Sequence, residues 1–64
     1  MDAKSIGITI AKLRHKCGMK QSDLAKKLSI SDKTVSRWEN GLGYPEITQF
    51  PILASVFGVT VDYL

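Results

Sequence analysis

The apolar residues near the start of the chain recur at the spacing of one helix face. They stand at positions i, i+4, i+7 and i+11, and are Ile6, Ile10, Leu13 and Cys17. Such a stripe is typical of an amphipathic helix that buries one side. Gly18 follows the stripe, and Lys16 lies in its last turn, as is common where helices end. The pattern therefore predicts a first helix that stops before Gly18.

A second and a third helix are predicted on either side of a short turn. Residues 21–28 carry Leu24, Ala25 and Leu28 on one face. Residues 29–31 make a three-residue turn. Ser31 ends this turn and is a good N-cap, because its hydroxyl can accept hydrogen bonds from the free N–H groups of the next helix. The third predicted helix runs over about residues 32–40.

The third predicted helix is unusual in how little apolar surface it offers. Val35 and Trp38 are its only apolar residues, and their spacing of three lets both face a core. The remaining side chains are polar and would face away from that core. Asn40 and Gly41 supply a left-handed exit from the helix. We therefore expect this helix to be held by two anchors and to present a polar face to a partner.

The remainder of the chain predicts a loop and two further helices. Residues 41–45 form the loop, because they contain two glycines and a proline. Thr48 is expected to cap the fourth helix, with Pro51 at its third position, where a missing N–H costs little. The stripe of this helix is Phe50, Leu53, Ala54 and Phe57, and Gly58 ends it. Thr60 is expected to cap a fifth helix that begins in residues 61–64.

The pattern as a whole predicts an all-α fold of five short helices around one core. Helices of eight to ten residues are marginal in isolation and must pack together. The expected core residues are Ile6, Ile10, Leu13, Met19, Leu24, Leu28, Ile30, Val35, Trp38, Ile47, Leu53, Ala54, Phe57, Val59 and Val61. Residues 1–64 thus form one domain. Because the chain stops inside the fifth helix, we expect a domain cut from a longer protein, such as the N-terminal part of a regulator.

The second and third helices together have the plan of a helix-turn-helix, two helices joined by a tight turn. A helix fits the major groove of B-form DNA, where residues in its N-terminal half can reach base edges. A polar third helix after a three-residue turn is what this plan requires. The sequence therefore indicates duplex DNA as a candidate partner.

Charge is distributed unevenly and supports this candidate. The net charge is +3, but all nine Lys and Arg lie in residues 1–37, and residues 38–64 hold Glu39, Glu46 and Asp62 with no base. Such asymmetry is typical of a protein with a polyanionic partner on one side. A basic face that only contacts solvent is the alternative, and charge alone does not decide between the two.

Composition excludes several other classes of function. The chain has one Cys and one His, so it predicts neither an internal disulfide nor a closed zinc site, and we expect no metal and no cofactor. It offers no nucleophile–base set and no Gly-rich phosphate loop, so we do not expect an enzyme. No apolar run is long enough to span a membrane and no signal peptide is visible, so the expected location is the cytoplasm, with no membrane partner.

The stretch "GMKQSDLAKKLSISDKTVSRWENG", residues 18–41, resembles the helix-turn-helix of the phage repressor and Cro-type (XRE) family of transcriptional regulators. The shared features are Leu-Arg before a Gly, then Gln-x-x-Leu-Ala, a three-residue turn, a capping Ser or Thr, and Trp-Glu-Asn-Gly. "YPEI" and "LASVFGVTVDYL" further resemble the last two helices of that family. The similarity covers about residues 5–64, and its specificity lies in several motifs that occur in order at the right spacing.

The resemblance implies roles for individual residues. At the base-reading positions or beside them stand Asp32, Lys33, Thr34, Ser36 and Arg37, of which Thr34 and Ser36 are expected to meet backbone or a thymine methyl group. The resemblance implies phosphate contacts for Gln21 and Asn40, and we also predict them for Lys20, Ser31 and Tyr44, although Tyr44 can equally serve loop packing. The resemblance also implies an ion pair between Arg14 and Glu39, with a DNA contact as the alternative role of Arg14.

Two positions depart from the family pattern. Lys20 stands where a capping Thr, Ser or Asn is usual, which gives up roughly 1 kcal/mol of capping and adds a candidate phosphate contact. Asp32 is an unusual residue to face DNA. It can accept a hydrogen bond from a cytosine N4 group. The alternative is a purely structural role, in which it caps the helix and restrains Lys33 or Arg37.

One such helix contacts only a few base pairs, so useful specificity requires two copies. The sequence therefore predicts a homodimer on an inverted-repeat operator, with half-sites about one helical turn, roughly 34 Å, apart. The fifth helix and residues beyond the chain are the expected contacts between copies. The alternative from another class is a protein-interaction module whose basic face meets an acidic protein. A preference among duplexes of equal length distinguishes the two.

Overall fold

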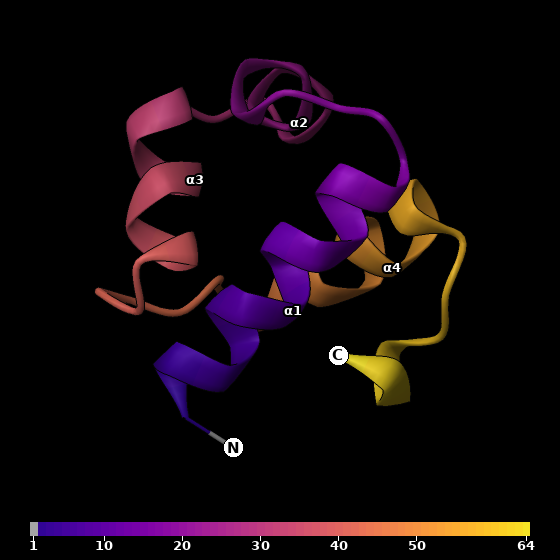
Figure 1. The fold of residues 1–64 in the computed structure, drawn as a ribbon. Helices are drawn as coiled ribbons and strands as arrows, with labels where there is room; N and C mark the ends of the chain where they lie inside the picture. Colours follow the sequence, from indigo (N-terminus) through magenta and orange to yellow (C-terminus); the bar gives the residue numbers. More distant parts are fainter. Residues whose placement is uncertain (1) are drawn as a thin grey trace.

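The computed structural model describes residues 2–64, which form four α-helices and two short 3₁₀ turns. They are α1 (Ala3–Lys16), α2 (Gln21–Leu28), α3 (Asp32–Glu39), η1 (Ile47–Gln49), α4 (Phe50–Phe57) and η2 (Val61–Tyr63). In Figure 1 α2 lies across the top, α3 stands on the left, and η2 lies at the lower right. Among these residues, no helix combines the length and the apolar character needed to cross a bilayer.

The helix ends lie close to where the sequence signals place them. The Ser31 hydroxyl accepts a hydrogen bond from the backbone N–H of Thr34 at 3.2 Å and so caps α3. Gly18 and Gly58 follow α1 and α4 with φ of 70° and 71°, a left-handed conformation that favours glycine. Asp2 adds a cap that the sequence pattern did not identify, because its carboxylate accepts from the N–H of Ser5 at 2.7 Å.

The predicted fifth helix and the predicted cap of the fourth helix are wrong. The fifth helix is only the 3₁₀ turn η2, in which Tyr63 N–H donates to Thr60 and Leu64 N–H donates to Val61. Four residues can close a single turn, and single turns favour these tighter i→i−3 bonds. Thr48 does not cap α4; it lies inside η1, whose start is instead closed by the Glu46 N–H donating to the Gln49 side chain at 3.1 Å.

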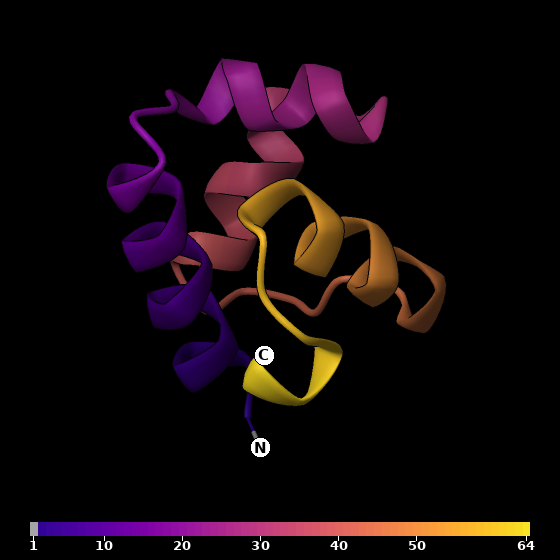
Figure 2. The ribbon, with the colours of Figure 1, turned by 90° about the vertical axis from the view of Figure 1, so that its right-hand side faces the viewer.

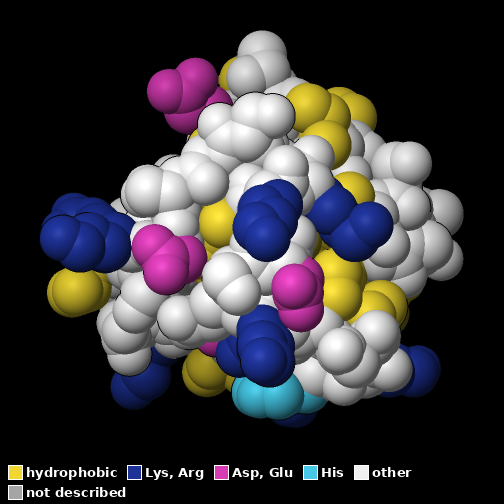
Figure 3. Space-filling view, turned by 90° about the horizontal axis from the view of Figure 1, so that it is seen from above, with side chains coloured by type: hydrophobic (Ala, Val, Ile, Leu, Met, Phe, Trp, Pro, Cys, Tyr) yellow, Lys and Arg dark blue, Asp and Glu magenta, His cyan; other side chains and the backbone are white. Residues whose placement is uncertain are grey.

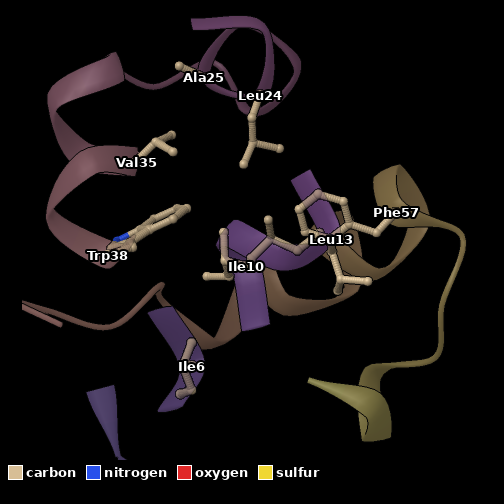
Figure 4. Packing of buried hydrophobic residues seen from close by; sticks show 9 residues of the cluster. Ile6, Ile10, Leu13, Leu24, Ala25, Val35, Trp38 and Phe57 are labelled. Carbon is tan, nitrogen blue, oxygen red and sulfur yellow. The ribbon is translucent and has the colours of Figure 1, made fainter. Parts of the chain in front are cut away.

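One apolar core joins all four α-helices, and Figure 4 shows its side chains meeting between α1, α2, α3 and α4. The fully buried side chains are Ile6, Ile10, Leu24, Val35 and Leu53. Each such burial contributes about 1.5–3 kcal/mol. Three positions differ from expectation: Ile47 is 84% exposed, Val61 is 47% exposed, and Cys17 is exposed as the C-cap of α1. Figure 2 shows the C-terminal segment carrying Val61 running along the outside of the helices.

A close approach between α1 and α3 sets the position of the third helix. A Cβ atom at Gly7 would lie 2.1 Å from the Trp38 carbonyl oxygen, so only glycine fits this crossing. The same carbonyl accepts from the Gly41 N–H at 3.0 Å, which closes the C-terminal end of α3. The contact therefore fixes the end of α3 against the middle of α1.

The Gly7→Ala substitution should be strongly destabilising, because its methyl group must push α3 away from α1. We expect the free energy of unfolding to fall by about 2 kcal/mol or more. Urea unfolding followed by circular dichroism measures this. The matched control is Gly43→Ala, since a Cβ at Gly43 meets nothing within 4 Å. Equal unfolding midpoints for the two variants would contradict the crossing.

Candidate nucleic-acid interface

The third helix is anchored on one side and free on the other. Val35 is 0% exposed and Trp38 4% exposed, so these two side chains hold α3 to the core. At its N-terminus the Ser31 hydroxyl also lies 2.9 Å from the Thr34 hydroxyl. Thr34 is half-buried, so its hydroxyl belongs to the cap.

The outward face of α3 carries the other residues predicted to contact bases. Asp32, Lys33 and Arg37 are exposed, and Ser36 is half-buried. Helical spacing places Lys33, Ser36 and Arg37 on the side away from Val35 and Trp38. Within residues 2–64 the only ion pair closer than 4 Å is that of Arg14 with Glu39, so Asp32 makes no ion pair with its basic neighbours. Lys33 and Arg37 are therefore exposed cations without an acidic partner among these residues.

The end of α3 and the following loop hold several of these side chains. The Asn40 amide donates to the Ser36 carbonyl at 2.8 Å, which turns it back along the helix. The Arg37 guanidinium donates to the Leu42 carbonyl at 3.3 Å. Tyr44 is 55% exposed, and the buried Pro45 after it attaches the loop to the domain. The loop thus lies beside the outward face of α3, with the Tyr44 side chain accessible.

The N-terminus of α2 is the second part of the candidate interface. Lys20 is its N-cap residue and contributes no side-chain cap, but its N–H donates to the Asp23 carboxylate at 2.8 Å. This bond replaces part of the capping that Lys20 gives up. Within the described residues the N–H groups of Gln21 and Ser22 have no acceptor. Free N–H groups at a helix start favour an anion such as phosphate.

A network centred on Glu39 joins the two parts. Arg14 donates from Nε to Glu39 Oε2 at 2.6 Å and from Nη2 to Oε1 at 2.9 Å, the pair that the family resemblance implies. Arg14 also donates to the Met19 carbonyl at 2.9 Å. The Gln21 amide donates to Glu39 Oε1 at 3.1 Å, so the side chain predicted to contact phosphate is bonded to the last residue of α3.

The network is nearly enclosed and strongly charged. The side chains of Arg14 and Glu39 are 9% and 8% exposed. Burial alone would raise the pKa of Glu39, but hydrogen bonds from Arg14 and Gln21, with the charges of Arg14 and His15, outweigh it and lower that pKa. The hydrogen bonds to Glu39 likewise raise the pKa of Arg14. Both groups are therefore ionised at neutral pH, and their charges cancel within the domain.

The face that carries α2 is mixed in charge rather than uniformly basic. Figure 3 looks onto this face from above and shows Lys and Arg side chains interleaved with Asp or Glu. Lys26 and Lys27 lie exposed in the last turn of α2. Among residues 2–64 no cluster of three His, Cys, Asp or Glu side chains is arranged to hold a metal ion. The unpaired N–H groups at the start of α2 are the feature of this face that favours an anion.

Sequence patterns alone missed three contacts of this interface. The bond from Gln21 to Glu39 joins residues 18 positions apart, beyond any helical period. The contact of Arg37 with Leu42 depends on the path of a glycine-rich loop. The contact of the Lys20 N–H with Asp23 could have been found, because an acidic residue at the third helical position is half of a capping box.

The lowered pKa of Glu39 predicts acid lability with a definite sign. A carboxylate whose pKa is lowered by folding stabilises the protein above the usual glutamate pKa, and this contribution is lost as pH falls through the lowered value. Glu39→Gln should therefore be less stable than the native protein near neutral pH, and the difference should shrink between about pH 5 and pH 2. Urea unfolding at a series of pH values measures it.

A second carboxylate, that of Asp2, also has a lowered pKa and would add its own pH dependence to the stability of both proteins. The pKa of Asp2 is lowered by its hydrogen bonds from Ser5. Both proteins should therefore carry Asp2→Asn, which keeps a capping oxygen without the charge. A stability difference that does not change with pH would show that the charge of Glu39 contributes nothing.

Comparison with known proteins identifies relatives over most of this chain. A family model described as helix-turn-helix (HTH_3) matches residues 10–64. The HTH-type transcriptional activator BcrR of Enterococcus faecalis is 34% identical over 55 residues, which are 86% of this chain and 27% of that protein. The 26 kDa repressor protein of Escherichia phage HK022 is 42% identical over 45 residues, 70% of this chain and 19% of that protein.

A solved structure has the same fold. The crystal structure of apo-HppE matches with a TM-score of 0.86 and 27% sequence identity, over 97% of this chain and 35% of that one. The chain thus spans about a third or less of each of these relatives. The family model, the two regulators and the helix-turn-helix of α2 and α3 agree, and the chain belongs to the HTH_3 (XRE-type) family of DNA-binding helix-turn-helix domains of transcriptional regulators.

Proposed function

We propose that this domain binds double-stranded DNA in a sequence-specific manner, with α3 in the major groove. The observation that carries the proposal is the outward face of α3, where the free charges of Lys33 and Arg37 stand opposite the two buried anchors. The free N–H groups of Gln21 and Ser22 lie at the start of the preceding helix. A helix-turn-helix bound to DNA uses these two regions for base and phosphate contacts.

Two energetic terms would act together. Lys and Arg near phosphates release condensed counterions, so affinity should fall steeply with salt concentration. Lys33 and Arg37 favour the O6 and N7 atoms of guanine, and each good contact discriminates by about 1–3 kcal/mol. The phosphate term holds the domain on any duplex, and the base term selects among duplexes. We therefore infer a G·C pair within each half-site.

The remaining predicted contacts take narrower roles in this proposal. Asp32 is exposed and unpaired among the described residues, so its carboxylate is available to a cytosine N4 group. The hydroxyls of Ser31 and Thr34 bond each other, which leaves the Thr34 methyl group for a thymine methyl. Lys20, Gln21, Asn40 and Tyr44 remain the phosphate contacts, and for Asn40 the amide bonded to Ser36 leaves its oxygen free.

Selection of bound sequences from a random-duplex library at physiological salt tests the proposal. We expect enrichment of a short motif that contains guanine, because Lys33 and Arg37 select at base edges and not only at phosphates. The matched control is Arg37→Ala, which should relax the preference at one position of the motif and leave the others. Binding without enrichment would instead favour a basic protein-interaction module.

We further propose that two copies bind together on an inverted repeat. The candidate contact is an apolar groove of about 340 Å³ lined by Ile47, Phe50, Pro51, Val61 and Leu64. Single exposed apolar residues are ordinary, but a contiguous set suggests an interaction surface. A second copy can bring the same groove to a two-fold axis, as closed dimers do. Figures 1 and 2 show η2, which contributes Val61, well separated from α3, so this contact would leave α3 free.

The size of the groove predicts where the dimer forms. Stable interfaces bury roughly 800 Å² on each partner, and five side chains of a small domain supply less. We therefore expect weak association in solution. Two half-sites on one duplex hold the copies at a high effective concentration, so pairing should become effective there.

Val61→Asp should weaken the pairing of two copies without weakening the binding of one copy to DNA. A carboxylate buried in the groove disfavours pairing, and α3 is unchanged. We expect weaker, less cooperative binding to a duplex with two half-sites and unchanged binding to a duplex with one. Gel-shift titration on the two duplexes measures both. Ile8→Asp is the matched control, since Ile8 is also 47% exposed but lies on α1 outside the groove. Equal loss in both variants would argue against the groove.

A further inference from the structure

Gln21 carries an amide whose orientation is fixed by the protein itself. A carboxylate only accepts hydrogen bonds, so Glu39 Oε1 at 3.1 Å must face the Nε2 group of Gln21 and not its oxygen. One of the two N–H bonds of this amide is then used. The other N–H points elsewhere and remains available to an acceptor. A surface glutamine is otherwise free to rotate about three side-chain bonds.

Glu39 can impose this orientation because it is itself immobilised. Arg14 holds both carboxylate oxygens through two parallel hydrogen bonds of 2.6 Å and 2.9 Å, a geometry that restricts rotation. The third Arg14 contact, to the Met19 carbonyl at 2.9 Å, fixes the turn that leads into α2. The same carboxylate therefore ties together the end of α1, the start of α2 and the last residue of α3.

We propose that Glu39 is a positioning residue for DNA binding, which acts by holding the Gln21 amide at the α2 N-terminus in register with α3. The proposal rests on the function proposed above, in which Gln21 contacts phosphate. Glu39 itself is nearly buried and its charge is matched by Arg14, so it does not repel the DNA backbone. Preorganised donors lose less conformational freedom on binding, which increases affinity without a new contact.

For the Glu39→Gln variant, the proposal predicts a change in DNA affinity opposite in sign to the change expected from charge alone. Glu39→Gln removes a negative charge from a DNA-binding domain, and charge alone would then tighten binding. Positioning predicts instead that affinity for a specific duplex falls, by about fivefold to tenfold. The base preference and the salt slope should stay as they are, because no base contact and no basic group has been removed.

A double-mutant cycle shows whether Glu39 acts through Gln21. Affinity is measured for the native protein, Glu39→Gln, Gln21→Met and the double variant, each corrected for its folded fraction from circular dichroism. If Glu39 positions Gln21, then Glu39→Gln should change the affinity by less than about twofold in the Gln21→Met background, where the amide is absent. An equal loss in both backgrounds, or tighter binding by Glu39→Gln, would overturn the proposal.

A measurement on the native protein keeps the proposal testable if Glu39→Gln does not fold. The two Gln21 side-chain N–H signals are followed by NMR during titration with the specific duplex. We expect one signal to keep its position, since its bond to Glu39 persists, and the other to shift on contact with phosphate. Movement of both signals would mean that Glu39 releases the amide, and would overturn the proposal. Absence of any preferred duplex for the native protein would instead remove the proposed function itself.

Discussion

The arrangement of this domain depends on one nearly buried carboxylate, that of Glu39. Two guanidinium N–H groups of Arg14 and one amide N–H of Gln21 converge on its two oxygens. These contacts come from three different helices or their ends, and each helix alone is too short to be stable in water. A buried ion pair gives little net stability, but removing one partner strands the other charge. The network therefore specifies geometry more than it adds stability.

Packing around the network is equally restrictive. Trp38 precedes Glu39, and its carbonyl lies where any side chain at Gly7 would have to be. Its ring belongs to the same core as Val35 and Ile10. The end of α3 is thus fixed from two sides, by a close backbone crossing and by hydrogen bonds. With so few core residues, a shift of one helix would be transmitted to the others, because protein interiors are closely packed.

Local signals in the sequence were sufficient for the four α-helices and for the two anchors of α3. Ser31 and Gly18 have physical preferences that need no tertiary information. The last residues could not be predicted in this way. Ile47 and Val61 look like core residues in an apolar pattern, but the pattern does not report whether another element covers them. The ion pair of Arg14 and Glu39 came from family resemblance, and the contact of Gln21 with Glu39 came only from the structure.

The distribution of charge follows from this arrangement. Where Arg14 and Glu39 hold the helices together, positive and negative charge cancel and lie almost out of solvent. Where α3 faces outward, Lys33 and Arg37 are exposed and have no acidic partner within the described residues. Arg14 is nearly buried, and its Nε, Nη1 and Nη2 groups all donate to Glu39 or to the Met19 carbonyl, so the charge that holds the helices together is separate from the charge that faces outward. Because the framework and the charged surface are separate, substitution of an outward residue leaves the contacts that hold the helices together intact.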